Sequence, residues 1–117
     1  MKVLATTAGG REIAVGSEFY GLETPHTDFV EQDADVVYRA TMHVLARVLS
    51  DVRMRGSEVV AIGFSSAMHG LLCVDDAGEP LSHVITWMDR RAHAIADGWR
   101  ADGTALELYA KTGAPMH

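Results

Sequence analysis

The chain has 117 residues, which is the usual length of one domain. Hydrophobic residues make up 48% and charged residues 22% of it, a composition typical of folded globular chains and not of disordered ones. Sixteen acidic and ten basic residues give a net charge of -6, which argues against a nucleic-acid partner because such a partner requires a basic face.

Two strands are predicted at the N-terminus, over residues 2–7 and 11–20. Gly9 and Gly10 between them can adopt the positive φ angles of a tight hairpin turn without steric cost. A phosphate-binding glycine loop is the alternative, but it requires more glycines and an adjoining helix. A hairpin is therefore the better interpretation.

A long helix is predicted after a connector over residues 21–32. Asp33 is a favourable N-cap residue for this helix. Apolar residues then recur at spacings of three and four up to about Met54, which is typical of a helix with one buried face. Gly56 is a natural C-terminal stop.

Three strands are predicted between this helix and the last part of the chain. Residues 58–65 form a β-branched, nearly continuous apolar run, which is typical of a strand covered on both faces. Residues 71–75 and 81–87 are predicted to form two further strands joined by a turn. A helix followed by such strands indicates an α/β fold.

Two helices are predicted in the last part of the chain. Asp89 is expected to cap a helix that runs to about Ala101, with Ile95 and Trp99 on its inner face. Residues 104–111 are predicted to form a second, shorter helix.

The single cysteine, Cys73, excludes a disulfide within the chain and any thiolate metal cluster. Its apolar neighbours predict a buried strand residue, and a chain without disulfides suits a reducing compartment. No apolar run approaches the ~20 residues that span a bilayer, and the N-terminus lacks a signal peptide. We therefore expect a cytoplasmic protein that does not enter a membrane.

Familiar catalytic motifs are missing from the sequence. It contains no GxxxxGK[ST] phosphate loop, no HExxH zinc helix, no GxSxG elbow and no CxxC pair. The six histidines never lie four residues apart on one predicted helix, so we expect no metal site.

Two polar segments depart from what packing alone would select. Residues 65–70 (SSAMHG) follow an apolar strand, and the ends of such strands commonly hold ligands in α/β sheets. A hairpin loop with serines bound to local backbone is the alternative. In the second segment, Trp87 could be a core anchor, Asp89 a helix cap, and Arg90 and Arg91 a solvated pair.

The order IGFSSAMHG, VDDAGEPL, ITWMDRR and TGAPMH closely resembles the N-terminal domain of FGGY-family carbohydrate kinases. Residues 31–33 (EQD) match the family's EQD before its first helix, and residues 10–11 match its DGR-type turn. The resemblance extends over residues 2–117. It implies an α/β fold, part of a ribonuclease-H-like (actin-type ATPase) domain, with a mixed sheet and flanking helices.

The resemblance also implies that residues 1–117 are a partial N-terminal sugar-kinase domain. The family's first strand and its DxGTT phosphate loop would precede Lys2, and its C-terminal domain would follow. The parent enzyme is expected to phosphorylate a sugar or sugar acid with ATP and Mg²⁺, whereas this chain alone is expected to be inactive.

Substrate-binding residues follow from the same resemblance. Met68 and His69 would line the sugar site, Trp87 would form a flat apolar wall, and Asp89 would accept hydrogen bonds from hydroxyl groups. Our own hypothesis is that Arg90 faces the carboxylate of gluconate. Gluconate is the favoured substrate, and xylulose or another pentulose is the alternative.

A function of a different class is also open. The chain could be a non-catalytic binding or assembly module, because the loss of an inner strand leaves a sheet edge with unpaired N–H and C=O groups. We therefore expect a homo-oligomer formed through the exposed sheet edge.

Overall fold

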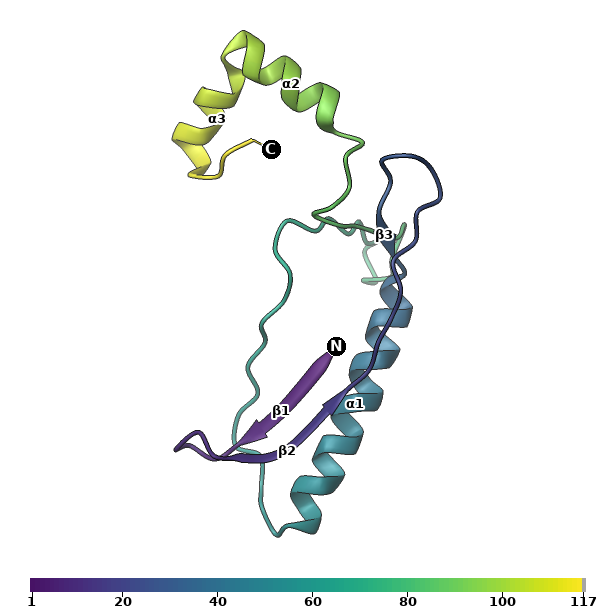
Figure 1. Cartoon of the computed structure of the whole chain (residues 1–117), viewed down its shortest axis with the longest axis vertical. Coiled ribbons are helices and arrows are strands. Elements are labelled where there is room, and N and C mark those ends of the chain that lie inside the picture. Colours follow the sequence, from purple (N-terminus) through teal and green to yellow (C-terminus); the bar gives the residue numbers. More distant parts are fainter. Residues whose placement is uncertain (117) are drawn as a thin grey trace.

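The computed structural model describes residues 1–116, an α/β chain with three helices and two small antiparallel sheets (Figure 1). In chain order the elements are β1 (Lys2–Thr6), β2 (Glu12–Ser17), β3 (Glu31–Gln32), α1 (Ala34–Met54), β4 (Val84–Ile85), α2 (His93–Asp102) and α3 (Thr104–Thr112). The last residue of the TGAPMH motif, His117, lies outside the described residues. The radius of gyration is 19.0 Å, whereas a compact chain of this length has about 13 Å, so the molecule is elongated.

The N-terminal hairpin is confirmed, although its strands are shorter than predicted. β1 and β2 pair antiparallel, with Leu4 opposite Val15. The Gly10 amide donates a hydrogen bond to the Thr7 carbonyl (2.9 Å), and Gly10 has a φ of 82°, which glycine adopts without strain. A glycine turn, and not a phosphate loop, therefore joins the two strands.

Helix α1 has the boundaries that the sequence predicts. The Asp33 carboxylate accepts hydrogen bonds from the amides of Asp35 (2.8 Å) and Val36 (3.1 Å), which is the N-cap arrangement. At the other end, Gly56 has a φ of 68° directly after the C-cap residue Arg55. Both ends are thus determined by residues within one turn of them.

The hydrophobic core lies between α1 and the β1–β2 hairpin. The residues of α1 that are buried in it recur at intervals of four: Val44, Val48 and Val52. They pack against Ala14 of β2 and the partly buried apolar residues of the hairpin. Full burial of a valine contributes ~1.5–3 kcal/mol, so this small core stabilises the helix on the hairpin.

The core also explains one glycine. A Cβ atom at Gly16 would lie 3.0 Å from a Val44 methyl group and 3.1 Å from a Val48 methyl group. Gly16 of β2 therefore lets the helix approach the hairpin closely.

Residues 58–65 do not form a strand, so that prediction is wrong. Within residues 1–116, no backbone hydrogen bond joins this segment to another part of the chain. Val60 and Phe64 are 96% and 88% exposed. A strand requires a hydrogen-bonded neighbour, and β1, the nearest candidate, pairs only with β2.

The predicted hairpin between residues 71 and 87 is confirmed in part. Leu71 bridges Ile85 and Val74 bridges Pro80, but only β4 is a regular strand, and it pairs with β3 from the predicted connector. Cys73 is exposed, which contradicts the predicted burial, because no element covers this side of the loose hairpin.

Helix α2 begins only at His93, because Asp89 does not cap it. Ala96 is buried, but Ile95 and Trp99 are 57% and 39% exposed, so their predicted inward orientation is wrong. The second short helix is confirmed as α3, which packs against α2 at the end of the molecule away from the core (Figure 1).

Candidate functional site

The two polar segments of the sequence lie side by side on the loose hairpin. Leu71 and Ile85 exchange backbone hydrogen bonds of 2.9 Å in antiparallel register. His69 precedes Leu71 by two residues and Trp87 follows Ile85 by two, so both residues lie just beyond this bridge, where His69 has a left-handed backbone and Trp87 lies in a turn. The end of the SSAMHG segment is therefore next to the start of the WMDRR segment.

His69 has an unusual backbone conformation. Its φ of 63° lies in the left-handed region, which a residue with a side chain adopts at an energetic cost. Such conformations cluster at binding and catalytic sites. Met68 and Trp87 beside it are large apolar residues that are 73% and 64% exposed. This corner of the hairpin thus combines a constrained histidine with two open apolar surfaces.

Asp89 is held by backbone and side-chain donors at both of its carboxylate oxygens. Oδ2 accepts a hydrogen bond from the Val30 amide at 2.8 Å, and Oδ1 accepts one from the Arg91 amide at 3.0 Å. The Arg91 guanidinium adds Nε to Oδ1 at 2.8 Å and Nη2 to Oδ2 at 2.7 Å. Because these contacts favour the charged form, above all the Arg91 side chain, the pKa of Asp89 is lowered to about 2.

Arg91 connects two parts of the chain that are distant in sequence. Its Nη2 also donates to a carboxylate oxygen of Glu31 in β3. Its guanidinium lies over the Phe29 ring, 3.8 Å from the centroid. The hydrogen bond to Asp89 raises the pKa of Arg91 most, and the hydrogen bond to Glu31 raises it further. We refer to Glu31, Asp89 and Arg91 as the ionic clamp.

Backbone contacts reinforce the ionic clamp. Thr86 donates both its amide (3.1 Å) and its hydroxyl (2.9 Å) to the carbonyl of Val30. The amide of Val30 is the donor to Asp89, so both polar groups of its backbone are engaged. Thr86 is 9% exposed. Its two hydrogen bonds to Val30 attach the Trp87–Arg91 segment to the residue that precedes β3.

Arg90 differs sharply from its neighbour. Its amide donates to the Asp28 carbonyl at 2.8 Å, which fixes the backbone. Its guanidinium, by contrast, is exposed and has no hydrogen bond or ion pair within residues 1–116. A fixed backbone with a free guanidinium is suited to bind an anion in solution.

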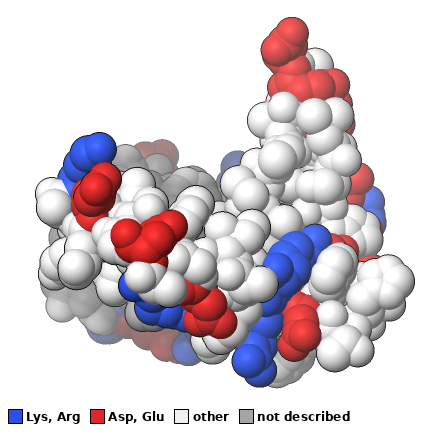
Figure 2. Space-filling model, turned by 90° about the horizontal axis from the view of Figure 1, so that it is seen from above, with Lys and Arg blue, Asp and Glu red and all other residues white. Residues whose placement is uncertain are grey.

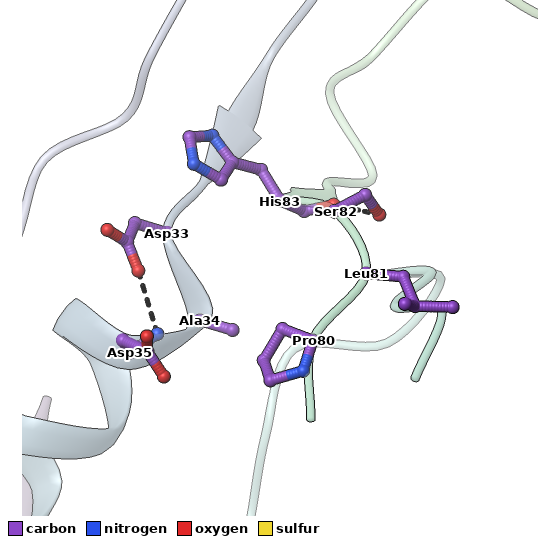
Figure 3. A pocket seen from close by; sticks show the side chains of 7 residues that line it. All are labelled: Asp33, Ala34, Asp35, Pro80, Leu81, Ser82 and His83. Carbon is purple, nitrogen blue, oxygen red and sulfur yellow. Dashed lines mark hydrogen bonds between the residues drawn. The ribbon is translucent and has the colours of Figure 1, made fainter. Parts of the chain in front are cut away.

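A small pocket of about 240 Å³ lies between the first turn of α1 and the loop of residues 80–83 (Figure 3). Asp33 lines it, and its pKa is lowered, first by the hydrogen bond from the Val36 amide. His83 lies on the opposite wall, 3.5 Å from a Glu23 oxygen and 3.6 Å from a Glu31 oxygen. Asp33 already accepts hydrogen bonds from two amides at the start of α1.

Charged residues are mixed on the visible surface. On the face in Figure 2, Lys and Arg form short separate groups beside Asp and Glu, with no broad basic patch. Across residues 1–116, no three His, Cys, Asp or Glu side chains come together as a metal-binding group. The described helices include none that is long and apolar enough to cross a membrane.

The predicted site residues thus fall into three kinds of environment. Met68, His69 and Trp87 lie at the exposed corner of the hairpin, and Arg90 offers a free charge from the segment after it. Asp89 lies beneath the surface, with its side chain 3% exposed, and its four hydrogen bonds leave no free lone pair.

Sequence reasoning missed the ionic clamp. Glu31 and Arg91 are sixty residues apart, and nothing in their local spacing predicts that they meet. The only available signal was that EQD and DRR both occur among the family motifs.

Comparison with known proteins gives a consistent result. The FGGY family of carbohydrate kinases, N-terminal domain, matches residues 1–117. A gluconokinase of Bacillus subtilis (strain 168) is 30% identical over 116 residues, which cover 99% of this chain and 22% of that protein. A glycerol kinase of Herminiimonas arsenicoxydans is 34% identical over 90 residues, 76% of this chain and 18% of that protein.

Solved structures agree with these relatives. A gluconate kinase and a ligand-bound xylulose kinase, both from Lactobacillus acidophilus, each superpose with a TM-score of 0.88 at 28% identity. Each superposition covers 99% of this chain and 23% of the other. The chain thus spans about a fifth of the length of the proteins that it matches.

Proposed function

The chain belongs to the FGGY family of carbohydrate kinases, and from this premise we propose that it provides the sugar-binding side of a kinase. The proposed reaction transfers the γ-phosphoryl group of ATP to a hydroxyl of a sugar or sugar acid. One O–P bond forms, the bond to the departing ADP breaks, and the hydroxyl proton passes to a base. That base is not among the residues assigned here, so we propose that residues 1–117 are a partial domain of a longer enzyme.

The proposed sugar site is the exposed corner of the hairpin. Trp87 and Met68 would cover the C–H face of the sugar, which their exposure supports. His69 would hydrogen-bond a hydroxyl, since an imidazole can donate or accept. For Asp89 a positioning role is better supported than direct binding of hydroxyls, because its carboxylate ties the Val30 and Arg91 amides together.

Gluconate is the substrate that we propose, and the free guanidinium of Arg90 carries this choice. An unpaired cation three residues after Trp87 favours a substrate with a carboxylate. Arg91 is less suited to this role, because the ionic clamp already uses its Nε and Nη2 donors. Xylulose, another pentulose or glycerol would leave Arg90 without a charged partner.

The test is a substrate panel on the complete kinase that contains these residues. Arg90→Gln should raise KM for gluconate about ten- to hundredfold, because a hydrogen bond to a charged group contributes roughly 1.5–3 kcal/mol. KM for ATP should stay unchanged. His69→Ala should lower kcat/KM for every sugar that the enzyme accepts. Equal effects of Arg90→Gln on gluconate and on a neutral sugar would refute the proposed carboxylate contact.

The fold and setting of the complete enzyme are part of the proposal. A ribonuclease-H-like, actin-type domain is supported by the packing of α1 on one face of the β1–β2 hairpin. ATP with Mg²⁺ would bind to parts of the enzyme other than the assigned residues. A cytoplasmic setting is in keeping with the single exposed cysteine, which forms no disulfide.

A second candidate function is an assembly module that associates through its open sheet edge. One observation favours it, namely the free edge of β1 next to exposed apolar residues. Homo-oligomerisation through this edge is compatible with the kinase role.

A further inference from the structure

The turn that precedes β3 contains a residue in an unusual backbone conformation. The Phe29 amide donates a hydrogen bond to the His26 carbonyl at 3.2 Å, which closes a four-residue turn. Asp28 is the third residue of this turn, and its φ of 68° lies in the left-handed region. Thr27 before it has a negative φ. The turn therefore has the φ pattern of type II, which ordinarily takes glycine or asparagine at the third position.

The carbonyl group of Asp28 has a partner that is distant in sequence. It accepts a hydrogen bond from the Arg90 amide at 2.8 Å. Because the peptide group is planar, the backbone angles of Asp28 determine the direction of this carbonyl. A residue that avoids positive φ values would turn the carbonyl away from Arg90.

The residue after Asp28 contacts the neighbouring arginine. The Arg91 guanidinium lies 3.8 Å from the centroid of the Phe29 ring. The His26 ring packs edge-on against the same phenyl ring, with centroids 5.3 Å apart and an interplanar angle of 86°. One turn thus contacts Arg90 through its backbone and Arg91 through a side chain.

The strained conformation of Asp28 is maintained by these contacts. Strain of this kind persists only where the surrounding structure compensates for it, and it is common at binding sites. The Asp28 side chain does not supply the compensation, because it is exposed and makes no hydrogen bond or ion pair within residues 1–116. The compensating contacts are the hydrogen bond from Arg90 and the stacking of Arg91 on Phe29.

We propose that Asp28 is a positioning residue for substrate binding, whose left-handed backbone holds Arg90 where its guanidinium can reach the carboxylate of gluconate. This inference rests on the proposed function, in which Arg90 binds that carboxylate. Asp28 does not touch the substrate and acts only through Arg90. Its contribution depends on its backbone conformation and not on its own carboxylate.

Kinetics on the complete kinase that contains these residues test the proposal. Asp28→Val should raise KM for gluconate about tenfold, because a β-branched residue avoids positive φ and the hydrogen bond to the Arg90 amide is lost. The kcat and the KM for ATP should not change. Asp28→Gly and Asp28→Asn should keep the wild-type KM, because both residues adopt left-handed conformations readily. Equal increases in all three variants would assign the effect to the carboxylate and would overturn the proposal.

Thr27→Val is the matched control. It places the same side chain at the neighbouring position of the turn, where φ is negative, and Thr27 is exposed. A β-branched residue already occupies this position, so KM for gluconate should stay at the wild-type value. An increase equal to that of Asp28→Val would refute a specific role for the left-handed residue.

A double variant shows whether Asp28 acts through Arg90. In an Arg90→Gln background, Asp28→Val should have no further effect on KM for gluconate, and full additivity of the two effects would overturn the proposal. An effect of Arg90→Gln without one of Asp28→Val refutes this inference and leaves the proposed function intact. If Arg90→Gln itself has no effect, the proposed carboxylate contact is refuted, and this inference is refuted with it.

Amide hydrogen exchange separates positioning from unfolding. In the 117-residue chain, Asp28→Val should accelerate exchange of the Arg90 amide about two- to tenfold, the protection that one hydrogen bond gives. The amide of Val48, in the buried face of α1, should exchange at the wild-type rate. Equal acceleration at both amides would show that Asp28 supports the whole fold, which would overturn the positioning role.

Discussion

Replacing Asp89 with asparagine should weaken the hydrogen bond that protects the Val30 amide from exchange with solvent. The carboxylate accepts that amide at 2.8 Å, and its charge also holds Arg91. Folding lowers the pKa of Asp89 from 3.8 to about 2. Each pKa unit corresponds to 1.36 kcal/mol, so the charged form of Asp89 stabilises the fold by about 2 kcal/mol. Asparagine keeps the size but loses the charge, so amide exchange at Val30 should accelerate about thirtyfold.

The same bond predicts a pH dependence. Because folding lowers the pKa of Asp89, its stabilisation is complete above pH 3.8 and is lost as the pH falls through about 2. The Val30 amide chemical shift should therefore titrate with a midpoint near pH 2. The Arg91 side chain, the Arg91 amide and the Val30 amide are the groups that face this carboxylate.

Asp97→Asn is the control for both measurements. Asp97 pairs with Arg100 on the surface, where its side chain is 63% exposed, and no described contact joins it to Val30. Amide exchange at Val30 should be unchanged in this variant. The reasoning fails if Asp89→Asn leaves the exchange rate of Val30 unaltered, or if the Val30 shift titrates near pH 3.8.

Four further outcomes are expected. Arg91→Lys should accelerate amide exchange at Val30 almost as much as Asp89→Asn does, because lysine lacks the bidentate fork and the stacking on Phe29. Gly16→Ala should lower the free energy of unfolding by about 1–3 kcal/mol in urea titrations, since its Cβ would meet Val44 at 3.0 Å, whereas Gly9→Ala should be nearly neutral. Asp33→Ala should cost about 1 kcal/mol in the same titrations, and Asp33→Asn should restore most of it. The purified 117-residue chain should phosphorylate no sugar and show no heat of Mg-ATP binding in calorimetry, because it covers only 22% and 18% of the two kinases that it matches.

Short-range signals explain which elements the sequence could predict. Asp33, the apolar spacing of α1 and Gly10 act on residues within a few positions of themselves, and each is confirmed. The run at 58–65 carries a different kind of information. It indicates that the segment is suited to burial, but a strand also requires neighbours, and the neighbours are a property of the whole sheet.

The same distinction applies to the candidate site. By local rules Asp89 is an acceptable helix cap. In the structure its oxygens instead bind the Arg91 guanidinium and the Val30 amide, because a bidentate arginine contact is stronger than a cap hydrogen bond. Glu31 joins across sixty residues, a contact that no local spacing encodes. The family motifs include both EQD and DRR, but they do not predict the ion pair between Glu31 and Arg91.

Arg90 and Arg91 show why the clamp matters for recognition. Identical side chains at adjacent positions have opposite environments, since three donors of Arg91 bind Asp89 and Glu31 while the Arg90 guanidinium has no partner among residues 1–116. The clamp fixes the backbone direction at Arg91, and the Arg90 amide is tied to Asp28 in the adjoining segment. The Arg90 guanidinium is therefore available to a carboxylate without first breaking an internal ion pair.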